Sequence, residues 1–431
     1  MTEFLTLLPA DEAWAIFMRH FTPVVTPEPC RVVEALDRVL ARDATAPHEL
    51  PTFVRGTVDG YAVQAADTHG ATPGLPAYLD VVAEAAMGQQ TDFILGSGQA
   101  ALVHTGGMVP EGADAVVMIE HTNRAGPPMF GATRNEKRKT EINPAAFEAY
   151  SIEVSRPVAA GDNCIQPGED VTAGELILPA GHTLRPQDLG GLLAVGITEV
   201  QATRRPRVGI VSQGDEVVSP EQEPGPGQVR DVNSYTLAGY VRRAGGIPLT
   251  YPIAPDTQEA IDAAVRRAFD EADVVVVTAG SSVSYRDLTA NAINALGKPG
   301  VLVHGVAIRP GKPTILAVCE GKPVFGLPGN PVSCINIFGR FVTPTIRLLL
   351  GAPPLKVQTV VAKLARNIPA ASGRADYVRV RLEARDGETW AVPIFGKSNL
   401  IFTLVRSEGV VEAPLNSNGI AAGAVVKVVL D

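Results

Sequence analysis

The sequence predicts a multidomain α/β plus β protein: a central, doubly wound, mostly parallel α/β domain, flanking small β-domains, and a C-terminal β-barrel. The length of 431 residues indicates several domains, because one domain has about 150 residues. Fully apolar strand-like runs alternate with helical segments over residues 204–350, which is typical of a parallel sheet covered on both faces. Short β-branched runs between glycine and proline turns fill residues 47–200 and 355–431, which is typical of small sheets and barrels.

Changes in composition divide the chain into four expected parts. Arg204–Pro206 and Gly351–Pro354 resemble linkers, because the periodicity of the sequence changes after each of them. The expected parts are an N-terminal linker and β region (residues 1–46 and 145–203), a small β-domain (47–144), the α/β domain (204–350) and the C-terminal barrel (351–431).

The first 200 residues are expected to begin with helices and continue with strands. Residues 9–20 predict an amphipathic helix, because Asp11 and Glu12 stand in the first turn, where the helix dipole favours acids. Residues 31–42 resemble a second helix, and residues 123–147 are expected to form an irregular surface loop. Strands are expected at Tyr78–Ala83, Gln99–Val103, Ala115–Ile119, Ser151–Val154 and Glu175–Leu178.

The α/β region alternates regularly, and the last part of the chain does not. Strands are expected at residues 208–211, 248–253, 274–278, 301–307, 314–318 and 323–326. Helices are expected within 233–244, over 256–270, within 287–296 and over 331–350. Residues 355–431 return to short strands without a strong helix, which indicates a small barrel.

Composition excludes several classes of protein. Acidic side chains outnumber basic ones by 46 to 37, which argues against a general nucleic-acid binder. The four cysteines are widely separated and the seven histidines lack zinc-site spacing, so neither a disulfide framework nor a structural zinc site is expected. We find no signal peptide and no apolar run near the ~20 residues that span a bilayer. A cytoplasmic protein is therefore expected.

Three loops at predicted strand ends carry small or acidic residues. Residues 279–282 follow the strand 274–278, and Gly329 and Asn330 precede a helix that starts at Pro331. Asp215 and Glu216 follow the strand 208–211. Because strand ends of a parallel sheet meet at one edge, these loops indicate a phosphate-binding crevice bordered by acids. Each loop alone is also consistent with a purely structural turn.

Further polar groups lie in other turns. Arg309 and Lys312 stand three residues apart in Ile308–Pro313 and could bind an oxyanion, although a solvent-facing loop has the same pattern. Asp59 and Asp170 could hold Mg²⁺ through oxygen ligands if their turns converge, and an Asp beside a Gly also marks ordinary turns.

The order of the motifs resembles the molybdopterin molybdenumtransferase family, which includes bacterial MoeA and the C-terminal domain of gephyrin. The motifs are DGYA, HTGG, GED, GDE, PGKP and GLPGNPVS, at residues 59–62, 104–107, 168–170, 214–216, 310–313 and 326–333. The likeness extends from Leu36 to the C-terminal barrel.

The resemblance implies an activity and an assembly. The family inserts molybdate into adenylylated molybdopterin, releases AMP and forms the molybdenum cofactor with Mg²⁺. It implies a homodimer in which the early β-domains of one subunit complete the cleft of the other. It also suggests other cofactor-biosynthesis proteins or recipient molybdoenzymes as partners. Molybdate and tungstate share charge and shape, so the residues predict a site for either oxyanion.

The resemblance assigns roles to matching positions. The expected catalytic residues are Asp59, Thr105, Asp170 and Glu216, with Asp59 and Asp170 also expected to hold the metal. The expected substrate-binding residues are Gly280, Ser281, Ser282, Asp287, Gly329, Asn330 and Ser333. The expected molybdate-binding residues are Arg309, Lys312, Pro313, Arg374 and Ser398.

The sequence departs from the family pattern in three places. Val54–Val58 replaces D-N-S-A-M, Thr278–Ser282 replaces T-S-G-G-x-S, and Ile165 stands where the G-x-N-x-R-x-x-G-E-D motif has arginine. The missing arginine favours an alternative: a non-catalytic molybdopterin-binding or scaffold protein. A hydrolase of the competence-damage type, which shares only the α/β domain, is a third hypothesis.

Overall fold

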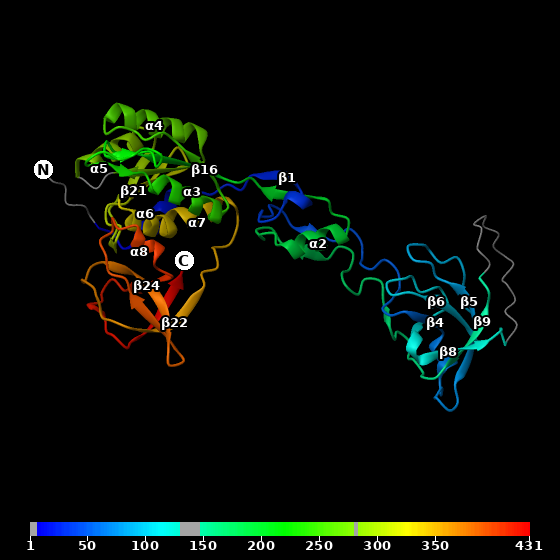
Figure 1. Cartoon of the computed structure of the whole chain (residues 1–431). Coiled ribbons are helices and arrows are strands. Elements are labelled where there is room, and N and C mark those ends of the chain that lie inside the picture. Colours follow the sequence, from blue (N-terminus) through cyan, green and yellow to red (C-terminus); the bar gives the residue numbers. More distant parts are fainter. Residues whose placement is uncertain (1–6, 130–146, 280–282) are drawn as a thin grey trace. The chain divides into compact units, whose positions relative to one another are not determined.

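The computed structural model describes residues 7–129, 147–279 and 283–431. The chain divides into two compact units (Figure 1). The main unit comprises Met1–Arg42, Pro179–Pro186 and Glu199–Asp431, and the β unit comprises Asp43–Leu178 and Gln187–Thr198. Within the described residues no helix is long and apolar enough to cross a membrane.

The main unit contains the predicted mostly parallel sheet. Its strand order is β16-β13-β17-β21-β20-β18, in which β16, β13, β17 and β21 are parallel and β20 pairs antiparallel with both β21 and β18. The bounds are β13 Arg207–Ser212, β16 Ile247–Thr250, β17 Val274–Ala279, β18 Pro299–His304, β20 Ile315–Cys319 and β21 Lys322–Pro328.

Helices cover both faces of this sheet, as predicted. Val274 and Val276 of β17 pack with α1, α3, α6 and α7 in one core, whereas Val275 and Val277 pack with α4 and α5 in a second core. Figure 1 shows α4 and α5 on the opposite side of the sheet from α3, α6 and α7. The bounds are α1 Ala10–His20, α3 Asn233–Ala244, α4 Gln258–Glu271, α5 Val283–Asn294, α6 Pro331–Ile337 and α7 Thr343–Leu349.

The helix expected over 331–350 is helical but not uniform. A π-helical segment, Phe338–Val342, separates α6 from α7. The hydroxyl of Thr345 donates to the carbonyl of Phe341 (2.8 Å) at this change. A π segment inserts an extra residue per turn, so it rotates the apolar face of α7 relative to that of α6.

The prediction of a helix over residues 31–42 is wrong. β1 (Pro27–Arg31) pairs with β12 (Glu199–Thr203), and only the short 3₁₀ turn Val32–Glu34 is helical. The N–H of Leu40 donates to the carbonyl of His182 (2.9 Å), and Asp37 has a φ of 61°. The backbone hydrogen bonds of this stretch therefore go to a distant segment, which removes the helix.

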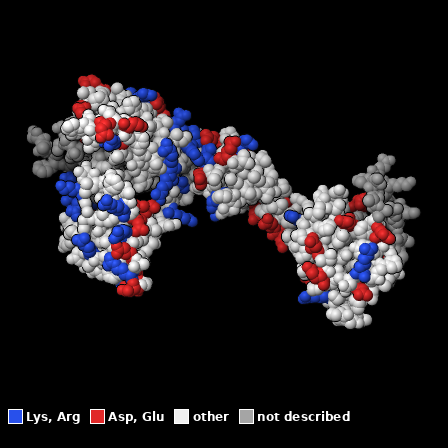
Figure 2. Space-filling view, in the orientation of Figure 1, with Lys and Arg blue, Asp and Glu red and all other residues white. Residues whose placement is uncertain are grey.

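A closed five-stranded barrel forms the C-terminal part of the main unit. The strands follow the order β24-β25-β22-β28-β26, and β26 pairs again with β24. β19 (Ile308–Arg309) adds to β24 in parallel. Figure 2 shows both signs of charge interspersed over the barrel, where Arg385 pairs with Glu383 at 2.5 Å. The bounds are β22 Thr359–Leu364, β23 Ile368–Pro369, β24 Ala375–Arg385, β25 Glu388–Pro393, α8 Phe402–Val405, β26 Gly409–Ala413, β27 Gly419–Ile420 and β28 Val425–Leu430.

The β unit is built on a second six-stranded sheet, β7-β4-β6-β5-β9-β8, in which only β5 and β6 run parallel. The five strands expected before residue 200 are confirmed. The prediction of an irregular loop over residues 123–147 is wrong at its start, because Thr122–Gly126 forms the edge strand β8. Residues 130–146 lie outside the described residues. The bounds are β2 Ala44–Thr45, β3 Arg55–Gly56, β4 Gly60–Val63, β5 Ala77–Glu84, β6 Gln99–Val103, β7 Ala115–Met118, β9 Tyr150–Val154, β10 Cys164–Ile165 and β11 Leu176–Leu178.

Three short elements complete the description. The helix α2 (Pro186–Ala194) follows β11 in the sequence. In the main unit, the strands β14 (Val217–Val218) and β15 (Val229–Arg230) pair in parallel between β13 and α3.

Candidate functional site

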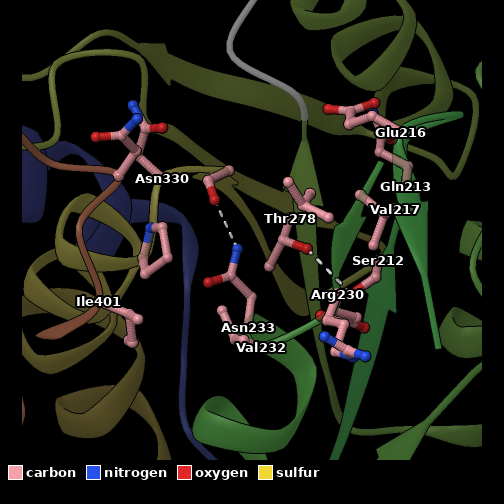
Figure 3. A pocket seen from close by; sticks show the side chains of 15 residues that line it. Ser212, Gln213, Glu216, Val217, Arg230, Val232, Asn233, Thr278, Asn330 and Ile401 are labelled. Atoms are coloured by element: carbon pink, nitrogen blue, oxygen red, sulfur yellow. Dashed lines mark hydrogen bonds between the residues drawn. The ribbon is translucent and has the colours of Figure 1, made fainter. Parts of the chain in front are cut away.

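A pocket of about 420 Å³ lies at the carboxyl ends of β13, β17 and β21 (Figure 3). These strands are neighbours in the sheet, so their last residues and the loops that follow meet at one edge. The lining includes Ser212 and Gln213 after β13, Thr278 at the end of β17, and Gly329 and Asn330 after β21. Asn399 and Ile401 of the barrel segment also line it.

Hydrogen bonds between separate elements fix the wall of this pocket. The hydroxyl of Thr278 donates to the hydroxyl of Ser212 at 3.3 Å, which ties β17 to β13. The amide of Asn233, at the start of α3, donates to the carbonyl of Gly329 at 2.7 Å (Figure 3). The N–H of Val332 donates to the carbonyl of Ser398 at 3.0 Å, which ties α6 to the barrel segment.

Two carboxylates and one guanidinium line the same pocket. Asp231 is 6% exposed and accepts the N–H and hydroxyl of Ser234, so it orders the start of α3. Glu216 is half-buried and lies beside the turn at Gly214, whose φ is +139°. Arg230 donates to Glu223 at 2.8 Å and to the carbonyl of Pro220. The guanidinium of Arg230 is thus paired with Glu223, so the charges that face a ligand are mainly the negative charges of the two carboxylates.

Gln213 is a pocket residue that sequence reasoning missed. Its side chain is 2% exposed, and its backbone N–H donates to the carbonyl of Thr278 at 3.2 Å. Its Oε1 accepts the hydroxyl of Thr289 at 3.3 Å, whereas its Nε2 has no hydrogen-bond partner within the described part of the chain. The signal in the sequence was an amide directly after the last residue of a buried strand.

The predicted substrate-binding residues divide into three groups. Gly329 and Asn330 line the pocket, and Asn330 is the residue before α6, although its side chain caps no N–H. Ser333 is buried within α6 and is not part of the lining. Gly280, Ser281 and Ser282 lie outside the described residues, as does the side chain of Asp287 in α5.

The predicted oxyanion turn is held against the barrel. Arg309 forms an ion pair with Asp376, which is 2% exposed, and donates to the carbonyl of Pro369 at 3.2 Å. Lys312 is exposed, and Pro313 and Arg374 are half-buried. Arg309 of β19 pairs in register with Asp376 of β24, and Arg374 lies two residues before Asp376 in the sequence.

In the β unit, Asp59 and Thr105 lie beside each other. Oδ1 of Asp59 accepts the N–H of Thr105 at 2.7 Å and its hydroxyl at 3.1 Å. These bonds, the N–H first, hold the pKa of Asp59 below its ordinary value although the side chain is 62% exposed. His104 bridges this loop to Glu84, with Nε2 at 3.0 Å from the carboxylate. Asp59 is therefore an accessible, ionised acid.

Asp170 and Ile165 lie five residues apart in the β unit, Ile165 in the strand β10 and Asp170 after it. Asp170 is exposed, and its N–H donates to the carbonyl of Leu50 at 3.0 Å. Ile165 pairs in register with Arg55, whose Nε donates to the carbonyl of Gly106 at 3.4 Å. An arginine thus stands opposite the position where the family motif has one. The described residues contain no group of three or more His, Cys, Asp or Glu side chains arranged for a metal.

Asp59 belongs to the β unit and Lys312 to the main unit. Each has been located within its own unit, so the convergence of the acidic and cationic residues on one substrate stays a prediction.

The fold and the pocket define the class of protein. A doubly wound sheet with a polar pocket at its strand ends is the usual site of small-ligand binding in α/β proteins. Three family descriptions match the chain: "MoeA N-terminal region (domain I and II)" at residues 8–196, "Probable molybdopterin binding domain" at 209–348 and "MoeA C-terminal region (domain IV)" at 361–430.

Individual relatives match over the whole length. The chain is 32% identical to the molybdopterin molybdenumtransferase of Bacillus subtilis, covering 100% of this chain and 95% of that protein. It is 27% identical to the Staphylococcus aureus protein of the same name, covering 92% and 89%. The solved structure of the molybdopterin biosynthesis MoeA protein from Pyrococcus horikoshii superposes with a TM-score of 0.82 at 34% identity and covers 99% of both chains.

The chain belongs to the molybdopterin molybdenumtransferase family, a family of transferases in molybdenum cofactor biosynthesis. The resemblance inferred from the order of the motifs is thereby confirmed.

Proposed function

We propose that this protein inserts molybdate into adenylylated molybdopterin and releases AMP, giving the molybdenum cofactor. The observation that carries the proposal is the pocket at the ends of β13, β17 and β21, most of whose lining belongs to the region that matches a molybdopterin-binding domain. Its polar lining and its volume of about 420 Å³ suit a pterin-sized ligand.

Molybdate is a dianion, and the proposal assigns its capture to the turn at Arg309–Pro313. Lys312 is exposed and supplies a compact positive charge, with Arg374 and Ser398 as further contributors. Arg309 is paired with the buried Asp376, so it holds the turn against the barrel as well as carrying charge. A cationic surface of this kind raises the local concentration of an oxyanion.

Asp59 is the acid best suited to Mg²⁺ in the β unit. It is ionised and exposed, and both hydrogen bonds from Thr105 are accepted by Oδ1, which leaves Oδ2 for a cation. Mg²⁺ is commonly bound by one or two carboxylates together with substrate phosphates, so a full protein cage is not required. Asp59, with Asp170, would hold the ion, which would polarise the phosphate linkage of the substrate when bound. Thr105 keeps the Asp59 carboxylate in one orientation.

The proposal also includes a homodimer in the cytoplasm, as the resemblance implies. Molar mass measured by light scattering would give twice the chain mass of 45.3 kDa. A measured molar mass equal to that of one chain, at the protein concentration of the activity assay, would remove the homodimer from the proposal.

An AMP-release assay tests the function. The purified protein is mixed with adenylylated molybdopterin, Mg²⁺ and molybdate, and AMP is separated by chromatography. Asp59→Asn should lower the rate about a hundredfold or more, because the charge that acts on the substrate is removed. Asp92→Asn, at an exposed position of the same unit, should leave it unchanged. Tight molybdopterin binding without AMP release would instead support the scaffold alternative.

A further inference from the structure

Gln213 lines the pocket with a buried amide, and its Nε2 has no hydrogen-bond partner among the residues that the structure describes. The side chain is 2% exposed and lines the pocket at the end of β13. Buried N–H groups are nearly always hydrogen-bonded in folded proteins, and leaving one unpaired costs stability. An unpaired donor that lines a pocket therefore points to an acceptor atom on the ligand.

The orientation of this amide is set by its other contacts. Oε1 accepts the hydroxyl of Thr289 at 3.3 Å, and the backbone N–H of Gln213 is bonded to the carbonyl of Thr278. Because the oxygen is taken up, the nitrogen is the end of the amide left for a ligand. The ligand atom opposite it has to be a hydrogen-bond acceptor.

The charges around the pocket indicate which acceptor this is. Asp231 and Glu216 line the same cavity, and Arg230 is engaged by Glu223. A phosphate group beside Gln213 would face two carboxylates of like charge, which is unfavourable. A 2-amino-4-oxo pterin offers a neutral carbonyl oxygen to the amide and N–H groups to carboxylates.

We propose that Nε2 of Gln213 donates to the carbonyl oxygen of the pterin ring and so selects the heterocycle, a role that rests on the proposed function. Glu216 is the acceptor for the N–H groups of the same ring edge. The pterin thus lies toward β13, and the phosphate end of the ligand lies away from Asp231 and Glu216.

Binding of three probes tests this assignment: molybdopterin, 6-hydroxymethylpterin, which lacks the phosphate, and inorganic phosphate. Gln213→Met keeps the length of the side chain and removes the donor. It should raise the dissociation constants of both pterins about tenfold or more, as expected for one lost hydrogen bond in a buried site. The dissociation constant of phosphate should not change. Gln222→Met, at an exposed position between β14 and β15, is the matched control and should change nothing.

The melting temperature separates recognition from structure. Gln213→Met removes the unpaired N–H but also the oxygen that accepts the hydroxyl of Thr289, so its melting temperature should change little while it binds pterin less well. A structural role predicts the opposite, a lower melting temperature with unchanged affinity. Gln213→Glu keeps the acceptor for Thr289 and should weaken pterin binding further, because a carboxylate would face the ring carbonyl.

The outcomes are distinct. Equal pterin affinity in wild-type and Gln213→Met protein overturns the inference and leaves the proposed function standing. Loss of phosphate affinity in parallel with pterin affinity places the amide at the phosphate and also overturns it. A wild-type protein that binds neither pterin overturns the proposed function itself.

Discussion

Arg309 and Lys312 stand three residues apart in one turn, yet their side chains have different surroundings. Arg309 pairs with the buried carboxylate of Asp376, and Lys312 is exposed. Removing the guanidinium would leave a buried charge without a partner, whereas removing an exposed ammonium removes little structure.

Two substitutions separate these roles. Arg309→Ala should lower the free energy of unfolding by about 2 kcal/mol, a value discounted because the arginine itself is half exposed. Lys312→Ala should change it by less than about 0.5 kcal/mol and weaken molybdate binding roughly tenfold. Urea unfolding and equilibrium binding measure the two effects, with Lys427→Ala in the barrel as the control. Equal stability loss in both variants would contradict this division.

Arg55 and Ile165 face each other across the β3–β10 pair. Residues directly opposite in an antiparallel pair project on the same face, so Arg55 presents its charge where an arginine at 165 would. Arg55→Leu should lower the rate of AMP release about tenfold. Arg55→Leu combined with Ile165→Arg should restore most of it, as measured in the same assay. A double variant as slow as Arg55→Leu would contradict this expectation, because a guanidinium at position 165 would then not replace the one at position 55.

Asp273 makes one pH-dependent contribution to stability. Burial alone would raise the pKa of Asp273, but hydrogen bonds from Arg204 and from the N–H of Arg207, with the Arg204 charge, outweigh burial and lower it. A carboxylate with a lowered pKa stabilises the fold above its unfolded pKa and loses that effect as pH falls through the folded pKa.

Asp273→Asn should therefore cost about 1 to 2 kcal/mol in the free energy of unfolding at pH 7. The difference from wild type should persist down to about pH 5 and narrow only below about pH 4. Urea unfolding across this range measures it, and Asp270→Asn on the exposed end of α4 is the control. A difference that already vanishes at pH 6 would exclude this mechanism.

The sequence indicated some candidate site residues and not others for a physical reason. Asp59 and Thr105 belong to short motifs whose residue types indicate their chemistry. In the structure hydrogen bonds join the two residues. Gln213 was missed because its significance comes from an amide nitrogen that has no hydrogen-bond partner within the described ranges. Arg55 was missed because its significance comes from its cross-strand partner Ile165, which is 110 residues away in the sequence. Neither property can be read from local composition.

At the scale of the element, β4 shows how a strand constrains the site beside it. Gly60 follows Asp59 directly, and a Cβ there would lie 1.9 Å from the carbonyl oxygen of Val117 in β7. The close pairing of β4 with β7 thus requires glycine, and it fixes the backbone from which Asp59 projects.

Gly60→Ala should lower the free energy of unfolding of the β unit by about 3 kcal/mol, because β7 has to move away. Gly74→Ala, where a Cβ would meet nothing within 4 Å, should be neutral or slightly stabilising. Thermal unfolding of the two variants distinguishes them. Equal melting of both variants would mean that the sheet adapts without cost.

Elements were predictable where their signals are local. The apolar runs of β13 and β17 and the amphipathic α1 lie where the sequence placed them, within a few residues. Residues 31–42 failed because their apolar spacing fits a helix, while the competing partners at 182–203 are distant in sequence. Only tertiary pairing decides such a case.

At the scale of the whole molecule, each unit has its own hydrophobic core. Phe17 of α1 is fully buried against Phe325 of β21 in the main unit, with ring centroids 5.4 Å apart. Tyr61, Leu79 and Ile152 belong to the separate core of the β unit. Units with separate cores can unfold in separate steps.

Calorimetry should therefore resolve two transitions. Phe17→Ala should lower the transition of the main unit by about 3 to 5 kcal/mol and leave the other in place. Gly60→Ala should move only the transition of the β unit. A single transition that moves in both variants would show that the two units unfold together.

The architecture of the main unit has a consequence during protein synthesis. Its helix α1 is made first, but Phe325, on which Phe17 packs, is made roughly 300 residues later. A ribosome adding about 5 to 20 residues per second leaves the apolar face of this helix uncovered for about 15 to 60 s. The nascent chain thus exposes this apolar helix face during a period in which the β unit, whose last residue is Thr198, can already fold.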